Sequence, residues 1–205
     1  MNDVILFDRD PRYIPRVAAV HDMCGYGKCS LTAAIPILSA AGCDVCPVPT
    51  ALFSAHTRYE VFTFHDTTEI LDGYLDAWRQ ENVDLDGVYS GFLGSAARSQ
   101  SSNAYRGVSA CLAVGGSGDG RRRRDLRHIH AGIMRGRWAH WVDGADVLMP
   151  NLTEASMLTG RTYPGQNIDN AEVNGIIDAL LALGAKNVVL KGVDRQDGII
   201  RNYVA

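Results

Sequence analysis

Three short polar stretches of this sequence combine ligand-binding side chains with turns that expose backbone N–H groups. Residues 21–30 are rich in glycine and follow the apolar run of residues 17–20. Residues 50–57 are dense in hydroxyl groups and include one histidine, and residues 151–154 hold an amide and a carboxylate. Loops at the carboxyl ends of parallel strands are where α/β proteins place ligand contacts. We therefore expect one small-molecule site where such loops meet.

The stretch Asn151-Leu-Thr-Glu154 follows a predicted strand and opens a predicted helix. An amide and a carboxylate at this place can hold a hydrated Mg²⁺ ion and a phosphate. The same two residues fit a capping box, with Asn151 as the N-cap and Glu154 three positions later, and the residues alone favour this cap. Lys191 follows another predicted strand, where it either neutralises nucleotide phosphates or is an ordinary exposed lysine.

Residues 25–30, Gly-Tyr-Gly-Lys-Cys-Ser, have some features of a P-loop. A P-loop needs a glycine five places before the Gly-Lys pair and a Ser or Thr directly after the lysine. Asp22 and Cys29 occupy these two positions, which excludes a Walker A motif. The glycines are equally consistent with turn formation and with ligand contact.

Composition limits the class of protein. A chain of 205 residues that is 46% hydrophobic forms one sizeable core and is short for two domains. A net charge of −3 argues against a nucleic-acid or membrane-surface role, and no apolar run reaches the roughly 20 residues of a spanning helix. The N-terminus lacks the pattern of a signal peptide. We expect a cytoplasmic protein with a loose leader, residues 1–15, and a single domain, residues 16–205, that binds neither nucleic acid nor membrane.

Five cysteines in a chain without a secretion signal indicate reduced thiols. Cys43-Asp-Val-Cys46 has the spacing of a zinc or redox pair, but no second Cys/His pair lies at a finger-like distance. Small buried or loop residues are the favoured interpretation of this pair.

Strand patterns alternate with helix patterns along most of the chain, which predicts an α/β fold. The expected strands are residues 17–20, 44–48, 85–89, 145–149, 187–190 and 198–204, and the expected helices are residues 31–38, 70–80, 152–158 and 174–183. Pro47 and Pro49 are expected to end the second strand. Because most strands are unbroken apolar runs, the sheet should be mostly parallel with helices on both faces.

Residues 99–140 break this pattern. Eight arginines against two aspartates give this segment a charge of +6, and therefore leave −9 on the rest of a chain whose total is −3. An exposed basic loop, a phosphate or RNA patch, and a frameshift product are the three interpretations, because such a long loop is unusual in a compact domain.

The motifs RVAAVHDMCGYGKCSLTAAIPILSAAGCDVCPVPTALFSAHT, YSGFLGS and ADVLMPNLTEASMLTG together resemble the pyridoxal/pyridoxamine kinases of the ribokinase-like superfamily. These proteins are close also to hydroxymethylpyrimidine kinases, and the resemblance runs through most of residues 16–98 and 141–204. It implies a ribokinase-like α/β fold, a homodimer, ATP and Mg²⁺ as cofactors, and transfer of the γ-phosphoryl group to the 5′-hydroxymethyl of a vitamin B6 vitamer.

The resemblance also implies roles for individual residues. Asp22 matches a position that bonds the pyridine ring, and Phe92 an aromatic position beside the vitamer. The remaining matches are a pocket-lining group, Ser54, His56 and Thr57, and a nucleotide group, Asn151, Glu154 (indirectly on Mg²⁺) and Lys191.

Two family motifs are absent from the sequence. The Gly-Thr-Gly-Asp motif, whose aspartate serves the family as catalytic base, lies beyond the end of the chain, so we name no catalytic residue and expect crippled turnover. The family's Val-Asp-Pro-Val-Met-Gly-Asp segment is spelled by a shifted frame of residues 115–121, which favours the frameshift interpretation of residues 99–140. The alternative functions are a hydroxymethylpyrimidine kinase and a non-catalytic vitamer-binding remnant.

Overall fold

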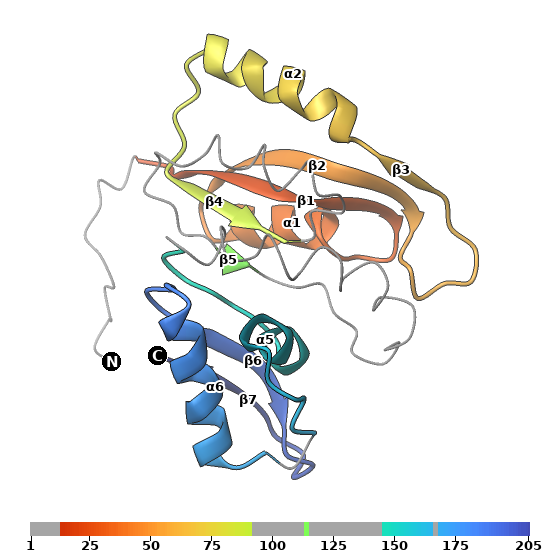
Figure 1. The fold of residues 1–205 in the computed structure, drawn as a ribbon. Coiled ribbons are helices and arrows are strands. Elements are labelled where there is room, and N and C mark those ends of the chain that lie inside the picture. Colours follow the sequence, from red (N-terminus) through yellow and green to blue (C-terminus); the bar gives the residue numbers. More distant parts are fainter. Residues whose placement is uncertain (1–12, 92–112, 115–144, 166–167) are drawn as a thin grey trace.

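The computed structural model describes residues 13–91, 113–114, 145–165 and 168–205, which form two sheets flanked by helices (Figure 1). The first sheet has the strand order β3-β2-β1-β4-β5, and the second pairs β6 with β7. The elements of the first part are β1 (Arg16–Tyr26), α1 (Leu31–Ala40), β2 (Asp44–Ala55), β3 (Phe64–Asp66), α2 (Thr68–Gln80), β4 (Gly87–Ser90) and β5 (Ala113–Val114). Those of the second part are α5 (Leu152–Thr159), α6 (Asn170–Ala182), β6 (Val189–Asp194) and β7 (Ile200–Val204).

The five-stranded sheet confirms the predicted α/β class. β1 pairs in parallel with both β2 and β4, β4 pairs in parallel with β5, and only β3 is antiparallel. Residues 18 and 20 of β1 point to a cluster that contains Leu71 and Leu75 of α2. α1 packs on the other face, so helices cover both faces of the sheet (Figure 1). No helix in the described ranges is long and apolar enough to cross a bilayer.

β1 is longer than the sequence predicted. The apolar run of residues 17–20 is only its first half, and the strand continues to Tyr26 through part of the expected glycine loop. Its pairing with β2 shifts register between His21 and Met23. Such irregularities bend a strand and re-aim its side chains. The shift falls at Asp22, the residue between His21 and Met23.

The prediction that Pro47 and Pro49 end the second strand was wrong, because β2 runs through both prolines to Ala55. The carbonyl groups of the two prolines accept hydrogen bonds from the hydroxyls of Tyr74 (2.9 Å) and Thr67 (2.7 Å). The N and C=O of a strand residue point to the same side, so both prolines direct their nitrogens away from β1. No ladder hydrogen bond to β1 is lost, which is the condition under which a strand tolerates proline.

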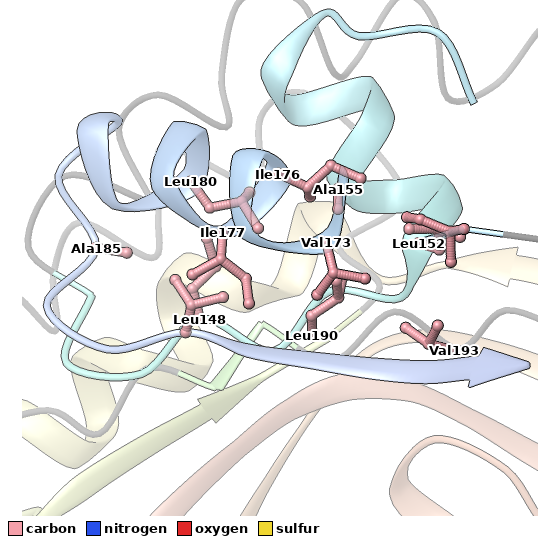
Figure 2. Close-up of a cluster of buried hydrophobic side chains, with 12 residues drawn as sticks. Leu148, Leu152, Ala155, Val173, Ile176, Ile177, Leu180, Ala185, Leu190 and Val193 are labelled. Carbon is pink, nitrogen blue, oxygen red and sulfur yellow. The ribbon is translucent and has the colours of Figure 1, made fainter. Parts of the chain in front are cut away.

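The second part has its own core, drawn in Figure 2. Twelve buried residues pack between α5, α6 and the β6–β7 hairpin, among them Leu148, Leu180 and Leu190, which are all fully buried. The predicted strand of residues 145–149 is reduced to one parallel bridge, between Leu148 and Val188. The predicted excursion of residues 198–204 is present as β7, antiparallel to β6.

Other predicted helices are present with shifted ends. The first two, predicted as residues 31–38 and 70–80, are α1 and α2, and each is two residues longer than predicted. The fourth, predicted from residue 174, begins four residues earlier because Asp169 caps it. Apart from β5, the basic segment of residues 99–140 lies outside the described residues, as does most of the leader of residues 1–15.

Candidate active site

Asp22 provides a buried carboxylate at the irregular end of β1. Its side chain is 5% exposed. One carboxylate oxygen accepts a hydrogen bond from the hydroxyl of Ser30 at 2.7 Å, and the other accepts one from the thiol of Cys24 at 3.7 Å. Burial raises the pKa of Asp22, and the hydrogen bond from Ser30 only partly opposes this. The residue is therefore a fixed, poorly hydrated hydrogen-bonding group.

His21 precedes Asp22 in β1 and is also buried. Its ring is 3% exposed and lies against Tyr89, with ring centroids 4.5 Å apart. Nε2 has no hydrogen-bond partner among the described residues. Burial, helped by the positive charge of Lys191, lowers the pKa of His21 to about 4. His21 is thus neutral near pH 7 and lies close enough to Lys191 to feel its charge.

The backbones of β1 and β2 approach each other closely near their C-terminal ends, at Gly25 and Ser54. A Cβ added at Gly25 would lie 2.9 Å from the carbonyl oxygen of Ser54, so only glycine fits there without a shift. The N–H of His56 donates to the carbonyl of Tyr26 at 2.8 Å, which continues the contact past the strand ends. His56 also lies close enough to Asp22 for its charge to lower the pKa of that carboxylate.

The three predicted pocket residues of this second stretch have different surroundings. Ser54 belongs to β2, and its hydroxyl accepts a hydrogen bond from the N–H of Thr63 at 2.7 Å, which closes the turn toward β3. His56 accepts at Nδ1 from the N–H of Arg58 at 2.9 Å. Thr57 is exposed in the turn that follows. Among these residues His56 is the one that the structure brings electrostatically close to Asp22.

Asn151 and Glu154 form the capping box that the sequence predicted. The side chain of Asn151 accepts from the N–H of Glu154 at 2.9 Å, and the carboxylate of Glu154 accepts from the N–H of Asn151 at 2.8 Å. These bonds satisfy two backbone donors at the start of α5 and fix both side chains. Both residues are half-buried. The N-terminus of α5 thus presents oxygen ligands together with the positive end of a helix dipole.

Lys191 connects the two parts of the site. Its backbone pairs with Asn151 in a parallel bridge, and its N–H donates to the carbonyl of Pro150 at 2.8 Å. Burial lowers the pKa of its ammonium group, and the nearby carboxylate of Glu154 opposes that shift. The same ammonium acts on the pKa of His21. The ammonium group of Lys191 is therefore close enough to Glu154 of α5 and to His21 of β1 to interact with both electrostatically.

Two residues of the site were not predicted, and Phe92, which was predicted, lies outside the described residues. His21 and Ser30 are the missed ones. A histidine that directly follows the apolar run of β1 is a signal that could have indicated His21. Ser30 could have been found as the polar residue before an apolar helix, although its hydroxyl bonds Asp22 and does not cap α1.

Known structures with the same arrangement identify the fold. A protein of Bacteroides thetaiotaomicron, provisionally designated a phosphomethylpyrimidine kinase and crystallised with pyridoxal, is 31% identical, with a TM-score of 0.77 over 91% of this chain and 65% of its own. The pyridoxal kinase of Lactobacillus plantarum is 27% identical, with a TM-score of 0.73 over 94% of this chain and 73% of its own. The chain is therefore similar to pyridoxal kinases and phosphomethylpyrimidine kinases. No protein-family model matches it.

This similarity agrees with the ribokinase-like fold predicted from the sequence. A pyridoxal kinase of Leishmania donovani, solved with ADP and pyridoxamine, is 20% identical with a TM-score of 0.74 and shares the fold. This chain spans 65% of the length of the Bacteroides thetaiotaomicron relative. The similarity to these kinases establishes the fold of the chain, while its substrate and activity are matters for proposal.

Proposed function

We propose that this chain carries the substrate pocket and part of the nucleotide site of a pyridoxal kinase. The reaction would transfer the γ-phosphoryl group of ATP to the 5′-hydroxymethyl group of pyridoxal, pyridoxine or pyridoxamine. The observation that carries the proposal is the buried carboxylate of Asp22, fixed by Ser30 at the end of β1. A relative at 31% identity was crystallised with pyridoxal, which supports this choice of substrate.

The environment of Asp22 suits a pyridine ring that carries polar substituents. A poorly hydrated carboxylate forms stronger hydrogen bonds to a ring N–H or hydroxyl than an exposed one does. The raised pKa of Asp22 also makes it easier for this group to share a proton with the bound ring. His56 and Thr57 are proposed to line the pocket beside it, with Ser54 holding the turn that carries them.

Asn151, Glu154 and Lys191 are proposed as the nucleotide side of the same site. Mg²⁺ prefers oxygen ligands and keeps several waters, so a half-buried carboxylate at a helix N-terminus fits an indirect role. The ammonium of Lys191 would neutralise phosphate charge next to it. When bound, Mg²⁺ would offset the charge that develops on the transferred phosphoryl group. These three residues orient the phosphates, because positioning and charge stabilisation supply most of the catalysis in phosphoryl transfer.

Two other functions have specific support. A hydroxymethylpyrimidine kinase is the second candidate, because the Bacteroides thetaiotaomicron relative carries a provisional designation of that kind. Vitamer binding without turnover is the third, because the buried carboxylate of Asp22 can bond a vitamer whether or not phosphoryl transfer follows. We further propose a homodimer, as expected from the family, with the exposed apolar residues of the β2–β3 hairpin region as the surface to test.

A kinase assay with side-by-side substrates tests the proposal. Purified chain is incubated with ATP, Mg²⁺ and either pyridoxal or hydroxymethylpyrimidine, and each phosphorylated product is quantified by chromatography. Faster phosphorylation of pyridoxal supports the leading proposal, and faster phosphorylation of the pyrimidine replaces it with the second. Pyridoxal binding in a calorimeter without any product supports the third. Absence of both binding and product contradicts all three.

Asp22→Asn and Asp44→Asn are the matched variants for this assay. Asp44 begins β2, at the opposite end of the sheet from the site, and forms an exposed ion pair with Arg16. Loss of a charge-assisted hydrogen bond to the vitamer should weaken binding about tenfold to hundredfold in the Asp22 variant. The Asp44 variant should bind the vitamer as the unmodified chain does.

A further inference from the structure

Two thiols and a carboxylate lie together under the loop between β1 and α1. The ligand atoms of Asp22, Cys24 and Cys29 are all within 4.8 Å of one another. Asp22 and Cys24 are buried and Cys29 is half-buried. The thiol of Cys24 bonds the carboxylate of Asp22 at 3.7 Å and also bonds the thiol of Cys29. This group of three residues is called the sulfur cluster below.

The local fold holds the sulfur cluster in place. Asp22 and Cys24 are two residues apart in β1, and the contact between thiol and carboxylate shows that their side chains meet. The chain then turns at Gly27, which has a φ of +86°, and an antiparallel bridge between Met23 and Ser30 closes the turn. This closure returns Cys29 to the strand from which Cys24 projects.

Neighbouring hydroxyl groups fix the cluster further. The backbone N–H of Cys29 donates to the hydroxyl of Thr32 at 3.1 Å, and that hydroxyl donates to the carbonyl of Cys29 at 2.8 Å. The hydroxyl of Ser30 holds one oxygen of Asp22 at 2.7 Å. Contacts beyond the cluster therefore hold the carboxylate of Asp22 and the backbone that carries the thiol of Cys29, as outer hydrogen bonds do around metal ligands.

We propose that Asp22, Cys24 and Cys29 form a binding site for a thiophilic divalent cation, with Zn²⁺ as the expected ion. Two sulfur ligands and one carboxylate oxygen match the donor types that Zn²⁺ takes, and three protein ligands leave a fourth position open. Hard cations such as Mg²⁺ take oxygen ligands and do not suit two thiols. Cys43 and Cys46, which have the sequence spacing of a zinc or redox pair, are not part of this cluster.

Zn²⁺ binding at the sulfur cluster releases protons and involves no oxidation or reduction. Zn²⁺ replaces the two thiol protons, which pass to solvent or buffer, and joins two thiolates and one carboxylate with no change of oxidation state. The bound site carries a net charge of −1. Burial raises the pKa of both thiols, so metal binding must displace protons that are held more tightly than in a free cysteine.

The site has a consequence for the proposed kinase, and this step rests on the proposed function. Asp22 is the residue proposed to bond the pyridine ring, so a cation on its carboxylate competes with the vitamer. Zn²⁺ at the cluster would then inhibit vitamer binding without touching the nucleotide side of the site. The competition is distinct from the use of a divalent cation with ATP.

Cobalt spectroscopy tests the site directly, with Co²⁺ as a substitute for Zn²⁺. The starting protein carries Cys43→Ser and Cys46→Ser, so that the other pair cannot bind, and is kept reduced with a phosphine. Titration with Co²⁺ should give visible d–d bands of tetrahedral intensity and a thiolate-to-cobalt charge-transfer band. Equimolar Zn²⁺ should abolish both. Cys24→Ala and Cys29→Ser, each added to this protein, leave one thiolate and should lower the charge-transfer intensity per bound Co²⁺ and weaken Co²⁺ binding at least about tenfold.

The outcomes separate the metal site from the kinase. No charge-transfer band with equimolar Co²⁺, or a band that both cysteine variants keep at unchanged intensity, overturns the metal site. Cys29→Ser guards against misfolding, because Cys29 is only half-buried and a thermal melt shows whether the variant is folded. Pyridoxine should reduce the d–d bands in proportion to its binding. If Co²⁺ binds and pyridoxine does not bind at all, the metal site stands and the proposed function fails.

Discussion

The helices of the C-terminal part and those of the N-terminal part begin in different ways. α5 and α6 each start with a complete capping box, built on Asn151 and Asp169. Neither α1 nor α2 has a side-chain cap. Ser30, at the N-cap position of α1, has a φ of 49° and gives its hydroxyl to Asp22. A left-handed backbone at a residue other than glycine costs about 1 kcal/mol or more, and such strain gathers at functional sites.

The two parts also differ in the size of their cores. Among the described residues, twelve form the C-terminal cluster, whereas six form the cluster between the first sheet and α2. The smaller cluster borders the strand that carries His21 and Asp22, two buried polar residues. We infer that the C-terminal part supplies local stability and a rigid support for the proposed nucleotide residues, while the N-terminal part keeps buried polar groups for the proposed vitamer pocket. The following predictions test this difference, from the largest expected effect to the smallest.

Leu180→Ala and Leu75→Ala compare the two cores. Both leucines lie on helices and are buried, Leu180 fully and Leu75 at 4% exposure. We expect a loss of about 4 kcal/mol in the free energy of unfolding for Leu180 and about 2 kcal/mol for Leu75, because the better-packed site collapses less into the cavity. Urea unfolding followed by circular dichroism measures both. Equal losses would remove the distinction between the cores.

The buried imidazole of His21 makes stability depend on pH. Its pKa is about 4 in the folded chain and about 6.5 when unfolded, so the unfolded state binds more protons between these values. The contribution is complete above pH 6.5 and decreases by up to about 3 kcal/mol as the pH falls toward 4. The raised pKa of Asp22 acts in the opposite direction, so the comparison must be made against His21→Asn.

Urea unfolding at several pH values between 4 and 7 measures this effect. The unmodified chain should lose stability relative to His21→Asn as the pH falls. His65→Asn is the control, because His65 is exposed, and it should follow the unmodified chain. Parallel curves for the unmodified chain and His21→Asn would show that folding leaves the pKa of the imidazole unchanged, which contradicts the lowered pKa.

The two capping boxes provide a matched pair for the nucleotide side. Asn151→Ala and Asp169→Ala each remove an N-cap hydrogen bond, of 2.9 and 2.8 Å, and should each lower the free energy of unfolding by about 1 kcal/mol. Only Asn151 belongs to the proposed nucleotide site. Titration with Mg²⁺–ATP should therefore show weaker binding for Asn151→Ala and unchanged binding for Asp169→Ala. Equal affinities of the two variants for Mg²⁺–ATP would show that Asn151 only caps α5 and does not contribute to nucleotide binding.

Two left-handed residues at helix ends give the smallest effects. Asn82 follows α2 with a φ of 52°, and Gly160 ends α5 with a φ of 69°. Asn82→Gly should stabilise the chain by about 0.5 kcal/mol, and Gly160→Ala should destabilise it by about 1 kcal/mol. An added Cβ at Gly160 meets nothing within 4 Å, so the change reports backbone strain only. Thermal melts of the two variants should shift in opposite directions.

Much of the fold follows from local patterns, but the sheet pairings do not. The order of strands and helices was predictable from apolar runs and turn residues, and the capping box at Asn151 from its spacing. The continuation of β2 through Pro47 and Pro49 was not, because it depends on which side of the strand faces a neighbour. The short strand β3 pairs with residues more than ten positions away, and nothing in its own three residues indicates this.

In the candidate site, too, some features were predictable from the sequence and others depend on how distant segments pair. Asp22 and the other pocket residues were selected through the resemblance, and the structure shows that Asp22 lies within β1, which continues to Tyr26. The bond from Ser30 to Asp22 and the field of Lys191 at His21 depend on register and on packing between distant strands. The sulfur cluster joins residues close in sequence, yet its geometry requires the bridge between Met23 and Ser30.

Calorimetric titration of the purified chain with pyridoxine tests the central claim most directly, namely that the loops at the ends of β1 and β2 form one vitamer pocket around Asp22. We predict one binding site for the unmodified chain and for Asp44→Asn, and an affinity about tenfold to hundredfold lower for Asp22→Asn. No binding by the folded, unmodified chain, or equal affinity in the Asp22→Asn variant, would contradict it.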